Sequence, residues 1–287
     1  MAATSVNIDY LREWIGKTET REDRITLTPM AALSATLDRD DPFPRDGDPL
    51  PPLWHWLYFL PLHRESELGE DGHPKRGGFI PPVPLPRRMF AGGRQQFHKP
   101  LRAGDAVSRV SRVADVTHKM GRNGALVFVL VRHEISTPEG LALIEEHDIV
   151  YREHSRPGEG AAQPQQAPAD APWSREIRAD AVMLFRYSAL TFNPHRIHYD
   201  LRYCTDVEGY SGLVVHGPLI ATALADLLRR NLPDARVTNF SFRAVRPIFD
   251  THPFSVHGRL ESDNKTVKLW AKDYEGWLCM EATAALA

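Results

Sequence analysis

The chain has 287 residues, of which 42% are hydrophobic and 25% charged, a composition typical of a globular protein with a buried core. Its formal net charge is −2, from 35 basic and 37 acidic residues, which argues against a nucleic-acid partner because such proteins carry a strongly basic face. The sequence has neither the roughly 20 apolar residues that span a bilayer nor the basic-then-apolar start of a signal peptide, so we expect a cytoplasmic protein without a membrane partner.

Helical patterns come first along the chain. Apolar residues at helical spacing predict a helix near the N-terminus, with one face formed by Tyr10, Leu11, Trp14 and Ile15. Thr28 followed by Pro29 resembles an N-cap and a first-turn proline, and predicts a second helix over the apolar residues that follow.

An aromatic stretch at 51–61 predicts a buried helix, whose Trp54, Trp56 and Tyr58 we expect in the core rather than in an acyl pocket. The polar, proline-rich residues 64–86 predict a loop. Strand patterns follow at 106–116, 124–136 and 141–151.

Residues 154–173 are rich in Pro, Gly, Ala and Gln, which is the composition of a linker. They separate two parts of similar length, 1–153 and 174–287, and this indicates a duplicated fold. Cys204 and Cys279 form no metal-type spacing and no framework of bridges, so we expect two free thiols.

The second part repeats the order of a helix followed by strands. A short strand candidate lies within 174–187, and 217–230 predict a helix with Pro218 near its start and basic residues in its last turn. Strand patterns follow at 237–244, 254–262, 266–274 and 277–286. The whole pattern predicts an α+β fold in which an antiparallel sheet wraps a helix, twice over.

Polar and titratable side chains gather just before the helix at 217–230. They are Asn193, His195, Arg196, His198, Tyr199 and Asp200. An apolar run then ends in His216 and Gly217 at the helix start. The first N–H groups of a helix have no partner within it, and a glycine lets a substrate carbonyl approach the backbone, so this segment indicates an oxyanion hole.

This stretch resembles the MaoC-like R-specific enoyl-CoA hydratases and the type 2 hydroxyacyl-thioester dehydratases. Their signature is an Asp, four residues, a His and then x-Asp, with a later His-Gly at the start of the central helix. His198 and Asp200 match the His and the second Asp, and VVHGPL matches the His-Gly segment. Asn193 stands where the family has its first Asp, and an amide cannot take up a proton.

Two longer motifs, YSALTFN-x-HRIHYD and PPLWHWLYFLP, resemble those hydratases of the family that act on branched C5 dicarboxylic acyl-CoAs. The resemblance implies a double hotdog: a degenerate first unit at 1–153, a linker at 154–173 and a catalytic second unit at 174–287. It also implies one active site per chain, and hydration of mesaconyl-C4-CoA, or of itaconyl-CoA after a shift of its double bond, to citramalyl-CoA.

Hydration of a conjugated thioester needs a base for the water and donors for the enolate. The resemblance implies His198 as the base and the Gly217 N–H as the oxyanion donor, while Asn193 orients the water or else only forms a turn before Pro194. We expect His195 either to support catalysis or to serve in loop hydrogen bonds, and Asp200 to be structural. No metal and no cofactor besides the coenzyme A of the substrate are expected.

The substrate carboxylate calls for a cationic partner, and Arg94 and Arg196 are the candidates, Arg196 also as a supporting residue of the site. Arg243 and Arg246 either bind the phosphates of coenzyme A or face solvent. We expect a homodimer that binds acyl-CoA.

Three other functions stay open at this point. The first is dehydration of hydroxyacyl chains on acyl carrier protein or coenzyme A, which is the same chemistry in reverse. The second is a hotdog thioesterase, which would release a free thiol. The third is a non-enzymatic acyl-CoA binder, suggested by the lost Asp.

Overall fold

Residues 6–121, 124–153 and 164–287 are described in the computed structural model of the protein. Within them, the first half contributes β1 (Thr18–Arg24), β2 (Arg87–Phe97), β3 (Ala106–Gly121), β4 (Gly124–Thr137) and β5 (Gly140–Arg152). The second half contributes β6 (Trp173–Ile177), β7 (Val237–Ala244), β8 (Phe254–Leu260), β9 (Thr266–Lys272) and β10 (Leu278–Leu286).

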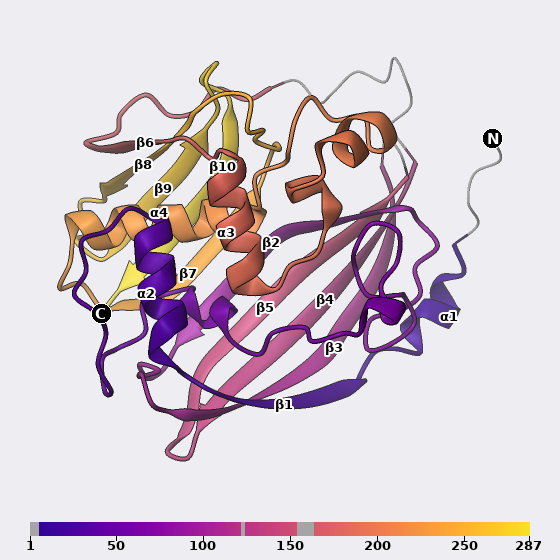
Figure 1. Cartoon of the computed structure of the whole chain (residues 1–287), viewed down its shortest axis with the longest axis horizontal. Helices are drawn as coiled ribbons and strands as arrows, with labels where there is room; N and C mark the ends of the chain where they lie inside the picture. Colours follow the sequence, from indigo (N-terminus) through magenta and orange to yellow (C-terminus); the bar gives the residue numbers. More distant parts are fainter. Residues whose placement is uncertain (1–5, 122–123, 154–163) are drawn as a thin grey trace.

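These strands form one ten-stranded sheet in the order β1-β3-β4-β5-β2-β7-β10-β9-β8-β6 (Figure 1). The order β1-β3-β4-β5-β2 of the first half returns in the second half as β6-β8-β9-β10-β7, strand for strand. The halves meet where β2 pairs antiparallel with β7, residues 92–96 against 239–243. The sheet therefore consists of one five-stranded unit used twice.

Helices cover one face of this sheet in Figure 1: α2 (Leu27–Thr36), α3 (Ala181–Thr191) and α4 (Gly217–Asn231). α4 packs against β6, β8, β9 and β10, and its residues 219–228 are all buried. The helix of the first half, α2, is shorter and contacts α3 and the 3₁₀ helix η1 (Trp54–Leu57). An antiparallel sheet wrapped on a helix, present twice, is the double hotdog architecture of the α+β class.

Two clusters of buried apolar side chains stabilise the fold. The larger cluster joins the halves, since it contains Met30 and Leu33 of α2 together with Leu224 of α4. The smaller one lies on the sheet of the first half, where Val83 and Leu85 pack with residues of β3, β4 and β5. The segment before β2 is thus anchored in a core, although it is a loop.

A buried carboxylate also ties the halves together. Asp226 of α4 has a side chain only 1% exposed, and its oxygens lie 2.7 Å from Arg39, 2.7 Å from Arg230 and 3.2 Å from Arg175. Arg39 follows α2 in the first half, whereas Arg175 belongs to β6 of the second. The network therefore fixes α2 and α4 relative to one another.

Most of the predicted elements are confirmed. The seven strand patterns correspond to β3, β4, β5, β7, β8, β9 and β10, with ends shifted by up to five residues, and 217–230 form α4. The aromatic stretch contains η1, and 64–86 are a loop with one 3₁₀ turn, η2 (Glu65–Glu67). Trp54 and Tyr58 are buried as expected.

Other predictions were wrong in detail. The N-terminal helix α1 (Ile8–Arg12) ends early, so Leu11 is buried while Tyr10 and Ile15 are exposed. Thr26, not Thr28, precedes α2 as the N-cap. The candidate strand within 174–187 ends at residue 177, and the helix α3 follows, because the Asp180 side chain accepts from the Met183 N–H and caps it. β1 and β2 were not predicted.

Part of the expected linker, residues 154–163, lies outside the described residues. Its remainder runs beside the start of β10, where Leu278 N–H donates to the Gln165 carbonyl. Cys204 and Cys279 are free and buried, as expected. Among the described residues no helix is long and apolar enough to cross a membrane.

Candidate active site

The segment between α3 and α4 carries the polar motif. Phe192 ends α3 in the left-handed region, at φ 48°, and the Asn193 side-chain oxygen then accepts the His195 N–H at 3.1 Å. The short helix η3 (Arg196–His198) follows. These local turns, which Asn and a left-handed residue favour, bring the chain back toward the start of α4.

His198 is held in one orientation by the backbone. Its side chain is buried, and Nδ1 donates to the Val214 carbonyl at 2.6 Å. Burial lowers the pKa of His198 to about 4, although the bond to Val214 opposes that change. With Nδ1 carrying the proton, the other ring nitrogen, Nε2, is an unprotonated acceptor at neutral pH, the state that a general base requires.

His216 supports this arrangement from the other side. Its ring stacks on that of His198, with centroids 3.7 Å apart, and its Nε2 lies 2.8 Å from Ser188 Oγ. Burial holds the pKa of His216 well below its usual value, so the stacked pair carries no repulsive charge. Ser188 comes from α3, a helix that the sequence pattern did not reveal.

Gly217 begins α4 directly after His216. The first N–H groups of a helix have no acceptor within it and lie at the positive end of its dipole. A Cβ at Gly217 would meet only Phe90, whose carbonyl oxygen would be 3.9 Å away. The space on the Cβ side of Gly217 is therefore open, and Phe90 of β2 in the first half bounds it.

Substituting Gly217 by alanine should separate folding from chemistry. Because the new methyl group has room, we expect an unchanged melting temperature. The methyl group would occupy the space of a thioester approaching the N–H, and misplacement by about an ångström costs about 10²-fold in rate. Steady-state kinetics on an enoyl-CoA, with the melting temperature beside them, would contradict this if activity stayed at the wild-type level.

Asp200 and Arg196, two further polar residues of the motif, pair with each other. The Asp200 carboxylate accepts from the Tyr203 N–H at 3.0 Å and from Arg196 at 2.7 Å, as expected for a structural residue. Arg196 also lies over the Tyr203 ring and donates to the Glu70 carbonyl. Its charge is already paired with Asp200, and its role toward the substrate carboxylate stays a prediction.

Arg94, the other candidate for the substrate carboxylate, is also paired, and its role stays a prediction. It lies on β2, half-exposed and bonded to both Glu146 and Asp148. Its neighbour Gln95 is buried and donates to Glu145, and because successive strand residues point to opposite faces, Arg94 faces away from the core. Sequence cannot assign these faces when the strand itself is not predicted.

Arg243 and Arg246 lie near the end of β7. Arg243 is exposed and pairs with Glu281 at 2.9 Å, and Arg246 lies 3.7 Å from Asp273. These contacts agree with solvated positions and leave both free to exchange partners with a phosphate. A role in coenzyme A binding stays a prediction.

Aromatic rings line the side of the site that belongs to the first half. Phe90 lies within 6.4 Å of Trp56 and 5.6 Å of Phe242, centroid to centroid. Trp56 is fixed by its bond to the buried carboxylate of Glu145, at 2.8 Å. Unlike Trp54 and Tyr58, Trp56 is only partly buried, so it belongs to this wall as much as to the core.

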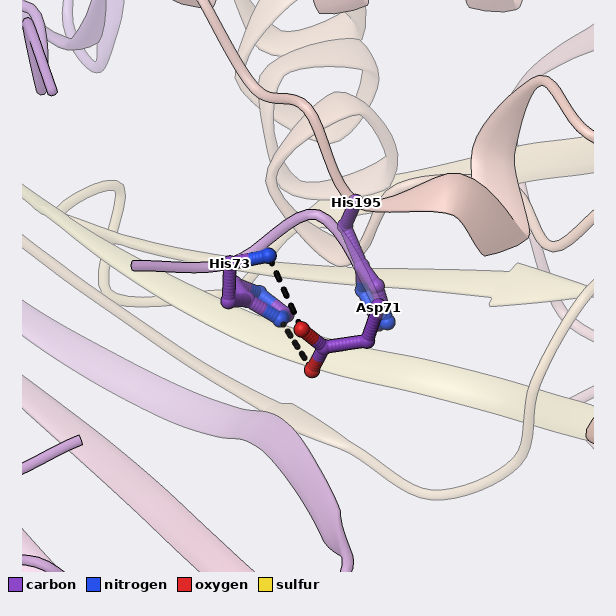
Figure 2. Close-up of side chains that lie close together, drawn as sticks. All are labelled: Asp71, His73 and His195. Carbon is purple, nitrogen blue, oxygen red and sulfur yellow. Dashed lines mark hydrogen bonds and ion pairs between the residues drawn. The ribbon is translucent and has the colours of Figure 1, made fainter. Parts of the chain in front are cut away.

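Sequence reasoning missed two residues of the first half. Asp71 and His73, from the loop 64–86, lie beside His195 (Figure 2). One ligand atom from each of the three lies within 4.8 Å of the others, so among the described residues this group could hold a metal ion. Their Asp-x-His spacing was the available signal, but nothing in the sequence linked it to residues 193–198.

A separate cavity of about 460 Å³ lies at the C-terminal end of α4, lined by residues such as Leu228, Leu232 and Phe97. The described residues that line it include neither His198 nor Gly217. The candidate active site therefore lies at the opposite, N-terminal end of α4.

Comparisons with known proteins agree with this fold. Residues 53–250 match the family described as hydroxyacyl-thioester dehydratase type 2, and the chain belongs to this family. Mesaconyl-C(4)-CoA hydratase of Chloroflexus aurantiacus is 46% identical over 273 residues, 95% of this chain and 96% of that protein. The mitochondrial hydroxyacyl-thioester dehydratase type 2 of Schizosaccharomyces pombe is 26% identical over 72% of this chain and 77% of its own length.

Solved structures show the same fold. A MaoC-like dehydratase from Phytophthora capsici superposes with a TM-score of 0.70 at 12% identity, covering 98% of both chains. HtdX of Mycobacterium tuberculosis gives 0.65 at 18% identity, covering 94% of this chain and 100% of that one.

Proposed function

We propose that this protein is a hydratase that adds water to mesaconyl-C4-CoA or a closely similar branched C5 dicarboxylic enoyl-CoA, giving citramalyl-CoA. The observation that carries the proposal is His198, fixed through Nδ1 on the Val214 carbonyl, with an unprotonated Nε2 close to the helix start at Gly217. The 46% identity to mesaconyl-C(4)-CoA hydratase supports the choice of substrate.

The chemistry follows from these groups. His198 Nε2 takes a proton from water while the oxygen bonds to the β-carbon, and the electron pair of the double bond moves to the thioester oxygen. The Gly217 N–H stabilises that enolate oxygen. The imidazolium then returns the proton to the α-carbon and the carbonyl re-forms, so that one water molecule has been added and the residues are restored.

A cationic partner for the second carboxylate of the substrate is Arg88. It lies two residues before Phe90 on β2, and residues two apart on a strand share a face, so Arg88 lies beside the aromatic wall. It is partly buried, and among the described residues its side chain has no hydrogen bond or ion pair. Burial first, and then the Arg88 charge among others, lowers the pKa of His73 and of His195, which supports a position near the site.

Substituting Arg88 by methionine should lower kcat/KM for mesaconyl-C4-CoA by about 10–10²-fold, the value of a hydrogen bond to a charged group. Crotonyl-CoA, which lacks the carboxylate, should be affected much less. Arg94→Met is the matched control, because Arg94 lies on the same strand but on the other face. Equal losses on both substrates would refute the assignment of Arg88.

The function itself is tested by incubating the protein with a panel of enoyl-CoAs and measuring the mass of the products. A gain of one water molecule, with the thioester intact, supports a hydratase. Preference for long hydroxyacyl chains would favour a dehydratase, the activity in the name of the yeast relative, and release of free thiol would identify a thioesterase. A reaction without added cofactor and a homodimer by light scattering stay predictions for the same preparation.

A further inference from the structure

The loop 64–86 of the first half reaches across to the motif of the second. The Arg196 N–H donates to the Asp71 carbonyl at 2.9 Å. Gly72, at φ +89°, approaches Pro194 so closely that a Cβ there would lie 1.9 Å from the Pro194 carbonyl oxygen. Only glycine fits this crossing, which positions the neighbours of Gly72 against residues 193–198.

Those neighbours form a carboxylate–imidazole pair. The Asp71 carboxylate accepts from both the backbone N–H and the Nδ1 of His73, each at 3.0 Å (Figure 2). The His73 ring lies 4.0 Å from the ring of His195, and His195 lies 5.4 Å from His198, centroid to centroid. The His73 ring therefore packs against His195, and His195 lies next to His198, the proposed base.

The three side chains of this cluster, Asp71, His73 and His195, differ in charge at neutral pH. Burial, opposed by the bond to Asp71, lowers the pKa of His73. Burial and the neighbouring imidazoles also lower the pKa of His195. Although burial opposes it, the bonds from His73 lower the pKa of Asp71. At neutral pH one ionised carboxylate therefore accompanies two neutral imidazoles, each with one acceptor nitrogen.

The attacking water has two protons to donate, and Asn193 is a neutral amide that a local hydrogen bond already engages. One lone pair of its side-chain oxygen accepts the His195 N–H, which leaves one acceptor site beside the two donors of the NH2 group. An Asp at this position would have kept an acceptor oxygen free. A neutral imidazole with a free ring nitrogen, next to the base, is a stronger candidate for holding the second proton of the water.

We propose that the first half completes the active site: His195 is the second hydrogen-bond acceptor for the attacking water, and Asp71 and His73 position its ring. The inference rests on the proposed hydratase function. His198 takes one proton of the water, while the other O–H bond is donated to His195, stays intact and becomes the hydroxyl of the product. No further proton or electron is required.

The surroundings favour this role over a cation site. Both oxygens of Asp71 already accept from His73, and a metal ion would have to replace the Nδ1 proton. The positive charges of Arg88 and Arg76 also act on His73, and they would repel a divalent cation.

The test compares His195→Leu, which removes the acceptor, with His195→Gln, which keeps one. We expect kcat on mesaconyl-C4-CoA to fall about 10²-fold in His195→Leu, in the range for one lost transition-state hydrogen bond, with KM and melting temperature unchanged. His195→Gln should recover at least about tenfold of this loss. Asp71→Asn should lower kcat but not KM, whereas Glu67→Gln, an exposed carboxylate of the same loop, should change neither.

Wild-type kcat in His195→Leu, or an equal loss in His195→Gln, would overturn the role of His195 while leaving the hydratase function intact. Absence of hydration by the wild-type protein would overturn both. Activity that is lost on chelation and restored by Zn²⁺ alone would assign the cluster to a metal and reject the proposal.

Discussion

Replacing His198 by alanine is expected to lower kcat by about 10²–10⁴-fold, the usual contribution of a general base. One ring nitrogen of His198 is bonded to the Val214 carbonyl, the other is left as an acceptor, and the ring stacks on His216, which directly precedes Gly217. The measurement is kcat on mesaconyl-C4-CoA and on crotonyl-CoA. Because the base acts on the water and on the α-carbon, which both substrates share, both should lose activity alike.

The control for this variant is His257→Gln, since His257 is also buried but lies on β8. Its activity should match the wild type.

The pH profile gives a second check. With a pKa of about 4, His198 stays unprotonated well below pH 6.5, the usual pKa of histidine. Activity should therefore persist as pH falls from 7 to 5. Full activity of His198→Ala would refute the site.

Replacing Asp226 by alanine is expected to lower the free energy of unfolding by about 3–5 kcal/mol, the cost of breaking a buried ion pair from one side. The substitution would leave Arg39, Arg175 and Arg230 close together without their shared carboxylate. Denaturant unfolding, followed by fluorescence and circular dichroism, measures the change.

The matched control is Glu281→Ala, which breaks the exposed pair with Arg243 and should cost at most about 1 kcal/mol. Since Asp226 contacts residues of both halves, the variant should lose both halves in one transition. A loss no larger than that of Glu281→Ala would show that the network does not stabilise the fold.

The first half supplies side chains to the candidate active site of the second half, which its sequence does not suggest. It lacks a copy of the motif at 193–198, yet it supplies Phe90 beside Gly217 and the pair of Asp71 and His73 beside His195. A duplicated unit that has lost its own motif can thus still serve the remaining one. A single active site between the halves stays a prediction.

The strands that the sequence predicted are those with strong apolar alternation, such as β4, whose alternate residues Val127, Val129 and Val131 are buried. β2 was missed because its sequence, RRMFAGGRQQF, is polar and contains Gly92 and Gly93. A Cβ at Gly92 would lie 2.6 Å from the Phe242 carbonyl oxygen. The glycine that obscures the strand pattern is therefore what lets β2 approach β7.

The sequence by itself determined the double hotdog class, most of the sheet, and the local core of the site, His198 and Gly217. Both residues belong to one continuous segment, where the motif and the start of a helix are local properties of the chain. The tertiary structure alone decided which charged side chains reach that core. Asp71 and His73 come from a loop without periodicity, more than 120 residues before His195, and Arg94 and Arg88 differ only in the face of a strand. The approach of Asp71 and His73 to His195 depends on how the loop packs, and the faces of Arg88 and Arg94 depend on how β2 pairs with β7. No local sequence pattern encodes either of these.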